Sequence, residues 1–215
     1  MSKNINELLS FIDSSPTAFF AVSNIADLLD KEGFKKLSES ETWDIKKGGK
    51  YYVCRNSTSI AAVKIGKKLD TYSFNIAASH SDSPNFKIKE NAELSVRDKY
   101  IQLNTEGYGG MIASTWLDRP LSVAGRVMVK NKNKYESRLV NIDRDLVLIP
   151  NLAIHMNRKV NEGIALNKQI DMLPLFSAGD GKRDALKNLI ANELEVSKSN
   201  IYGSDLYLYN RMKSS

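Results

Sequence analysis

The sequence predicts an α/β protein made of two parts that differ in secondary structure. Near the start of the chain, apolar residues recur every three or four positions, which is the spacing of amphipathic helices. From residue 51 the pattern changes to the alternation of apolar and polar residues that is typical of strands. Helix signals are nearly absent from residue 84 to about residue 165. These three observations favour an α/β unit followed by a β-rich unit.

Two helices are expected before residue 34. The first covers residues 4–13 and has Asn4 as its cap. In the second, Pro16 suits the first helical position, an apolar stripe follows from Phe19, and Gly33 is a natural stop. Aromatic residues at helical spacing indicate a buried face rather than a binding surface.

Strands are expected from residue 51 onwards. Residues 51–55 and 59–65 predict a hairpin around the turn at 56–58, and the more apolar residues 73–79 predict an internal strand. The β-rich unit is expected to supply five short strands, at residues 86–89, 100–104, 121–130, 135–142 and 146–149. A last helix is expected over residues 180–194, with Asp180 and Gly181 near its start, and a last strand over residues 205–209.

Composition limits the class of protein. The chain has 215 residues, of which 42% are hydrophobic and 26% charged, as in a globular protein. No apolar run reaches the roughly 20 residues that cross a bilayer, and the start of the chain lacks the apolar core of a secretory signal. The single cysteine, Cys54, cannot form an internal disulfide and fits a reducing compartment. We therefore expect a cytoplasmic protein without a membrane partner.

The net charge of +6 raises the question of nucleic-acid binding. The basic residues are scattered or lie in expected turns such as residues 130–134, and aromatic residues are not interleaved with them as a stacking surface requires. A lysine-rich surface is the better interpretation, and no nucleic-acid partner is expected.

His80 and Asp82 form the sharpest local feature, because they directly follow the expected inner strand. Ligand sites in open α/β sheets gather beyond the carboxyl ends of the strands. A histidine there can bind a metal through one ring nitrogen, and a carboxylate two residues later can orient it. The same two residues can instead form a structural hydrogen bond at the end of a strand, and the residues alone leave both interpretations open.

Residues 77–84 resemble the His-Thr-Asp-Ser-Pro signature of the M18 metallo-aminopeptidases, the group of aspartyl aminopeptidase and aminopeptidase I. Further segments are similar to the family's pattern in the same order. They are residues 14–19, 49–56, 108–110, 116–127 and 149–158. The resemblance therefore runs from about residue 14 to residue 209.

The resemblance implies a role for three residues. His80 corresponds to one ligand of a two-metal site, and Asp82 to the catalytic residue that orients the metal-site histidine. His155 corresponds to a histidine that reaches into the partner subunit's active site and helps to hold the substrate; from the residues alone, a buried histidine beside Leu152 and Ile154 is the preferred interpretation. Asp118 is assigned to a turn before a strand, with no catalytic role.

The resemblance also implies a fold and a domain order. The expected fold is a partial two-metal aminopeptidase α/β domain plus a β-rich inserted dimerisation domain. Residues 1–85 would be the N-terminal part of the peptidase domain, residues 86–203 the dimerisation domain, and residues 204–215 a strand returning to a truncated peptidase domain. Zinc is the expected metal, as two divalent ions in each complete site, although carboxylate-rich sites also accept manganese or cobalt.

The chain departs from the family in its metal ligands. The family supplies a bridging aspartate, an adjacent Glu-Glu pair, another aspartate and a final histidine, whereas this sequence contains no Glu-Glu dipeptide. We therefore expect a zinc-dependent aminopeptidase of peptide substrates that forms homo-oligomers through its middle domain, with this chain lacking most of the metal ligands and inactive alone. The alternative is a non-catalytic assembly or dimerisation module of a truncated or split aminopeptidase.

Overall fold

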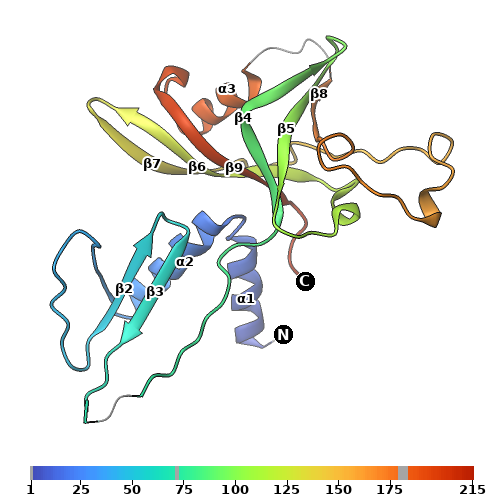
Figure 1. Ribbon diagram of the computed structural model, residues 1–215. Coiled ribbons are helices and arrows are strands. Elements are labelled where there is room, and N and C mark those ends of the chain that lie inside the picture. Colours follow the sequence, from blue (N-terminus) through green and yellow to red (C-terminus); the bar gives the residue numbers. More distant parts are fainter. Residues whose placement is uncertain (1, 71–72, 179–183) are drawn as a thin grey trace. The chain divides into compact units, whose positions relative to one another are not determined.

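The computed structural model describes residues 2–70, 73–178 and 184–215 and divides the chain into two compact units (Figure 1). The first unit consists of Met1–Ser83 together with Ser214–Ser215, and the second unit of Pro84–Lys213. Both units combine helices with a sheet, so the mixed α/β class expected from the sequence is found.

The first unit contains two helices and a small sheet. Its elements are α1 (Lys3–Asp13), α2 (Ala18–Lys31), β1 (Lys35–Lys36), β2 (Lys50–Arg55) and β3 (Ser59–Lys64). Strand β1 is parallel to β2, and β2 is antiparallel to β3, which confirms the expected hairpin. Helix α2 buries Phe19 and Val22, while the side-chain amide of Asn24 donates to Ser14 and Ser15 and so ties α2 to the turn that precedes it.

The expected inner strand at residues 73–79 is wrong. These residues adopt no regular secondary structure, and the side chains of Phe74 and Ile76 are 82% and 85% exposed. A strand needs neighbours that complete its ladder of N–H and C=O groups, and none of the strands in the described residues pairs with this segment. Its apolar pattern alone does not create the sheet that would make it an inner strand.

The second unit is built on a six-stranded antiparallel sheet with the order β7-β6-β9-β4-β5-β8. The strands are β4 (Asn85–Val96), β5 (Tyr100–Tyr108), β6 (Leu121–Asn131), β7 (Lys134–Asn141), β8 (Leu175–Ala178) and β9 (Ile201–Asn210). The short helices are η1 (Ala113–Trp116), η2 (Val160–Glu162), α3 (Ala185–Glu193) and η3 (Lys198–Asn200). Residues 146–149, expected as a strand, form only isolated bridges to Leu117, Leu121 and Leu175.

One face of this sheet carries the core of the second unit. Phe86 of β4, Leu103 of β5 and Leu208 of β9 are fully buried there, and α3 packs Leu186 and Ile190 into the same cluster. Alternate residues of each strand supply the core, as the period of two in the sequence predicts.

The helices of the described residues are short. Helix α1 has 11 residues, α2 has 14 and α3 has 9, and none of these described helices is long and apolar enough to cross a membrane. Helix α3 lies within the helix expected at residues 180–194, but the expected start at Asp180 and Gly181 falls outside the described residues.

Strand β9 differs from the expected domain order. Residues 204–215 are expected to return to the peptidase domain, yet β9 lies between β6 and β4 and pairs with β6 from Ile201 to Asn210, and only Ser214–Ser215 group with the first unit. The reason is that Leu206 and Leu208 fill the core of the second unit, which holds the strand in this sheet. The other expected domain boundaries stay a prediction.

Strands β6 and β9 approach each other closely at Gly125. A Cβ atom on this residue would lie 2.0 Å from the backbone oxygen of Asp205, and its φ of 157° is one that other residues rarely adopt. Glycine is therefore required at this position for the strands to pair as they do.

A single antiparallel pair, Lys87 with Tyr207, joins β4 to β9. Because β4 begins at Asn85 and β9 ends at Asn210, both three residues or fewer from this pair, the beginning of β4 and the end of β9 lie at the same end of the sheet.

Candidate active-site residues

His80 and Asp82 are in contact in the first unit. The distance between His80 Nδ1 and Asp82 Oδ1 is 2.9 Å, and the two side chains are 91% and 35% exposed. With a proton on Nδ1, the imidazole donates to the carboxylate, and Nε2 carries the lone pair that a metal would need. A carboxylate commonly fixes a metal-ligating histidine in this way.

The segment that carries this pair is tied to the hairpin of the first unit. Ser81 Oγ donates to the carbonyl oxygen of Thr58 at 2.7 Å. Thr58 ends the turn between β2 and β3, where Asn56 and Ser57 both adopt positive φ. This hydrogen bond holds the segment of His80 and Asp82 in place although residues 73–79 directly before it do not form a strand.

The described residues do not make a complete zinc site. No group of three or more His, Cys, Asp or Glu side chains within residues 2–70, 73–178 and 184–215 is placed to hold a metal ion. A catalytic zinc ion needs about three protein ligands, whereas His80 and its neighbour Asp82 offer one ligand and a carboxylate that orients it. These two residues fit part of a metal site and not the whole of it.

His155 lies in the second unit, on a long excursion between β7 and β8 that we call the arm (residues 150–174). The antiparallel bridge between Leu148 and Leu175 closes the base of the arm, which Figure 1 shows in orange, extending away from the sheet. His155 is the third residue of a turn in which the Met156 N–H donates to the Ala153 carbonyl at 2.8 Å.

The interpretation of His155 as a buried histidine is wrong. His155 is exposed, and the neighbouring Leu152 and Ile154 are 60% and 47% exposed. The structure thus brings His80 and Asp82 together, and it places His155 in the other unit on an exposed turn.

A cluster of charges on the second unit's sheet is not expected from the sequence. The carboxylate of Asp205 in β9 forms ion pairs with the guanidinium of Arg126 in β6, at 2.6 Å, and with the ammonium of Lys87 in β4, at 3.2 Å. All three side chains are partly buried. Burial opposes the ionisation of Asp205, but the hydrogen bonds from Arg126 and Lys87 outweigh it and lower the pKa of this carboxyl. The only signal in the sequence is the charged residue Asp205 directly before Leu206 in an apolar strand. Its partners Arg126 and Lys87 follow only from the register of β9 with β6 and β4.

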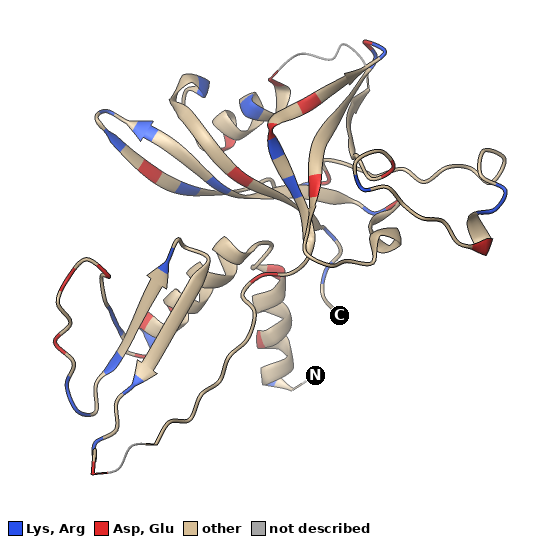
Figure 2. Ribbon diagram, in the orientation of Figure 1, with Lys and Arg blue, Asp and Glu red and all other residues tan. Residues whose placement is uncertain are grey.

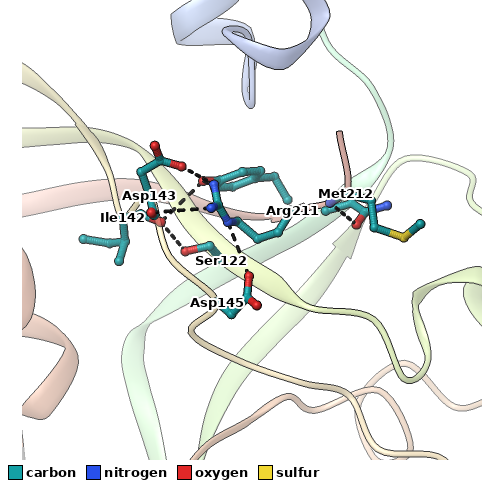
Figure 3. A network of polar contacts seen from close by, with 8 residues as sticks. Ser122, Ile142, Asp143, Asp145, Arg211 and Met212 are labelled. Atoms are coloured by element: carbon teal, nitrogen blue, oxygen red, sulfur yellow. Dashed lines mark hydrogen bonds and ion pairs between the residues drawn. The ribbon is translucent and has the colours of Figure 1, made fainter. Parts of the chain in front are cut away.

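A second polar network lies at the end of β9 (Figure 3). The guanidinium of Arg211 contacts the carboxylate of Asp143, and its Nε is 3.5 Å from Asp145 Oδ1. Beside it, the hydroxyl of Ser122 donates to the carbonyl of Ile142. This network fastens the last residues of the second unit to the loop after β7.

Basic and acidic residues are interspersed along the strands and loops of both units (Figure 2). Lys87, Arg126 and Arg211 are each paired with a carboxylate. Two basic residues of the second unit's sheet, Lys87 and Arg126, therefore share the single carboxylate of Asp205.

Comparison with known proteins gives one consistent result. The family model described as "Aminopeptidase I zinc metalloprotease (M18)" matches residues 11–215. The chain is 49% identical over 219 residues to a "Probable M18 family aminopeptidase 2" of Clostridium novyi (strain NT), a match that covers 99% of this chain and 51% of that relative. The chain thus spans about half the length of the curated relatives it matches.

Solved structures are similar as well. A chain in the cryo-EM structure of the Ape4 and Nbr1 complex matches with a TM-score of 0.91 at 35% identity, over 97% of this chain and 44% of that one. The Saccharomyces cerevisiae mApe1 dodecamer matches with a TM-score of 0.77 at 27% identity, over 98% of this chain and 49% of that one.

Proposed function

The chain belongs to the M18 family of aminopeptidases, and from this premise we propose that it carries part of a zinc-dependent aminopeptidase that removes N-terminal residues from peptides. The observation that carries the proposal is the 2.9 Å contact between His80 and Asp82 inside the matched region. In that arrangement the carboxylate holds a proton on one ring nitrogen and leaves the other nitrogen to a metal.

Three residues receive roles in this proposal. His80 is a zinc ligand, Asp82 orients it, and His155 acts on a substrate held in a partner subunit. Because His80 and Asp82 are fewer ligands than one zinc ion needs, we expect residues 1–215 alone to bind zinc weakly and to be inactive. We place the protein in the cytoplasm, where its one cysteine would stay reduced.

The test is a chimera of full family length. In it, this chain replaces the matched half of the Clostridium novyi relative, and the hydrolysis of aminoacyl p-nitroanilides and the zinc content are measured. His80→Ala should abolish activity and reduce bound zinc, and Asp82→Asn should reduce activity about 10- to 100-fold, as the loss of an orienting partner usually does. Asn75→Ala, an exposed change five residues before His80, is the control and should have no effect.

Two results would contradict the proposal. A His80→Ala chimera with unchanged zinc content and activity would show that this residue is not a ligand. Tight binding of two zinc ions by the 215-residue chain alone would contradict the expectation that it lacks ligands.

An assembly module is the second candidate. The similarity to the mApe1 dodecamer and the exposed Leu152 and Ile154 of the arm favour an interface with other copies. Light scattering would give the oligomeric state, and mixing the short chain with a His155→Ala chimera would show whether the short chain's His155 restores activity. A strictly monomeric chain that restores nothing would rule out this candidate.

A further inference from the structure

Asp118 has an unusual backbone conformation at the root of the arm. Its φ is 56°, in the left-handed region, where residues other than glycine, asparagine and aspartate are rare. Such a conformation persists where surrounding contacts hold it. The Asp118 N–H donates to the carbonyl of Ile149 at 2.9 Å, and Asp118 Oδ1 accepts from the Asn151 N–H at 2.9 Å.

These two hydrogen bonds hold the residues on either side of Pro150, at Ile149 and Asn151. Ile149 is fully buried and bridges to Leu117, so it belongs to the fixed part of the second unit. Pro150 has no N–H to donate, and the N–H of Asn151 is therefore the first donor of the arm. The carboxylate of Asp118 takes this donor at the point where the chain leaves the sheet.

His155 follows Asn151 by four residues, a length that spans at most about 14 Å. The turn from Ala153 to Met156 fixes the local shape around His155 through its own hydrogen bond. The direction of this turn therefore depends in part on how the chain is held at Asn151, while Met172 near the other end of the arm is buried in the core.

We propose that Asp118 is a positioning residue: it sets the direction in which the arm leaves the sheet and thereby where His155 is presented. The functional part of this inference rests on the proposed role of His155 toward a partner's substrate. Asp118 acts through the backbone of Asn151.

The 215-residue chain allows a direct test because it contains only two histidines. Each gives one imidazole Cε1–H signal in an NMR spectrum, and His80→Ala and His155→Ala assign the two signals. Amide exchange at Asn151 is measured on the same samples.

Three variants of Asp118 separate the hydrogen bond from the backbone conformation. Asp118→Ala removes the acceptor and keeps the strained φ, and Asp118→Gly removes the acceptor but relieves the strain. Asp118→Asn keeps an oxygen acceptor and tolerates the left-handed region. The control is Asp98→Ala, because Asp98 has a similar φ of 54° in the β4–β5 turn, away from the arm.

We expect the Ala and Gly variants to shift or broaden the His155 signal and to speed exchange of the Asn151 amide about fivefold, the effect of one ordinary hydrogen bond. Asp118→Asn, Asp98→Ala and the His80 signal in every sample should stay as in the original chain. If Asp118→Ala does not fold, the Gly variant gives the answer, since it carries no backbone strain. An unchanged His155 signal and unchanged Asn151 exchange in the folded variants would overturn the inference.

The chimera then separates this inference from the proposed function. Asp118→Ala should impair kcat/KM in the same sense as His155→Ala, and the double variant should be no worse than His155→Ala alone. If Asp118→Ala loosens the arm while neither it nor His155→Ala changes activity, Asp118 still positions the arm but His155 has no role in hydrolysis.

Discussion

Replacing Gly125 by alanine should disrupt the centre of the second unit. The new Cβ would lie 2.0 Å from the backbone oxygen of Asp205, whereas ordinary contact begins at 3.4 Å. The obstacle is a backbone atom, so no side-chain rotation relieves it, and β6 and β9 must separate by about 1.4 Å, the difference between those two distances. A separation of this size breaks two or three neighbouring hydrogen bonds of about 1 kcal/mol each, so we expect a loss of about 3 kcal/mol in the free energy of unfolding.

The assay uses one of the two tryptophans. Trp116 packs edge-to-face on the buried Phe86, with ring centroids 5.2 Å apart, and therefore reports unfolding of the second unit. In a Trp43→Phe background, urea unfolding followed by tryptophan fluorescence measures this unit without a signal from Trp43.

Gly203→Ala is the matched control, because Gly203 lies in β9 but its Cβ would meet nothing within 4 Å. It should change stability by less than about 0.5 kcal/mol. If Gly125→Ala costs no more than this control, the close approach of β6 and β9 does not require glycine and the reasoning is wrong.

Three further predictions concern the polar groups of the two units. Asp205→Asn should lower the free energy of unfolding by about 1.5 kcal/mol at pH 7 because two partly buried cations lose their partner. Since folding lowers the pKa of Asp205, the difference in stability between the original chain and the variant should shrink as the pH falls below the ordinary value of 3.8. Urea unfolding that shows an equal difference at pH 7 and at pH 3 would contradict this prediction. Tyr52→Phe should lower the free energy of unfolding by about 1 kcal/mol at neutral pH because the Tyr52 hydroxyl donates to Asp30 at 2.9 Å. Burial and this hydrogen bond raise the pKa of Tyr52 to about 12, so the stability gained from the tyrosine should be complete below pH 10 and disappear as the pH rises through 12. A difference in unfolding, followed by Trp43 fluorescence, that does not change with pH would refute the hydrogen bond to Asp30. Arg211→Lys should speed amide exchange near the end of β9 several-fold, because an ammonium group cannot bind the carboxylates of Asp143 and Asp145 in the fixed geometry of a guanidinium. Unchanged exchange would show that the Arg211 network does not hold the end of β9 in place.

Local signals predicted the helices and the hairpin of the first unit but not where the helices begin, because Ser2 rather than Asn4 precedes α1 and α2 begins at Ala18 after Thr17 rather than at Pro16. The two helices and the hairpin of β2 and β3 depend on neighbouring residues, and Gly33 ends the second helix region with a φ of 75°, as a glycine stop requires. Residues 73–79 failed because an apolar run becomes a strand only beside a partner strand, which its own residues do not specify.

The candidate site divides in the same way. His80 and Asp82 are two residues apart, so their contact is available to any reader of the sequence. The contact between Asp118 and Asn151 spans 33 residues and depends on how the arm leaves the sheet. A sequence pattern for Asp118 therefore indicates a turn, and only the fold shows what the turn holds.

The antiparallel pair of Lys87 with Tyr207 places the point where the chain enters the second unit beside the point where it leaves. A domain with adjoining ends can be inserted into a host fold without forcing apart the residues that flank it. Residues 84–213 should therefore tolerate circular permutation: a short linker can join the old ends, and new ends can open in the exposed turn at Lys132 between β6 and β7. We therefore expect the corresponding stretch of the gene to be transferable between host proteins as one piece.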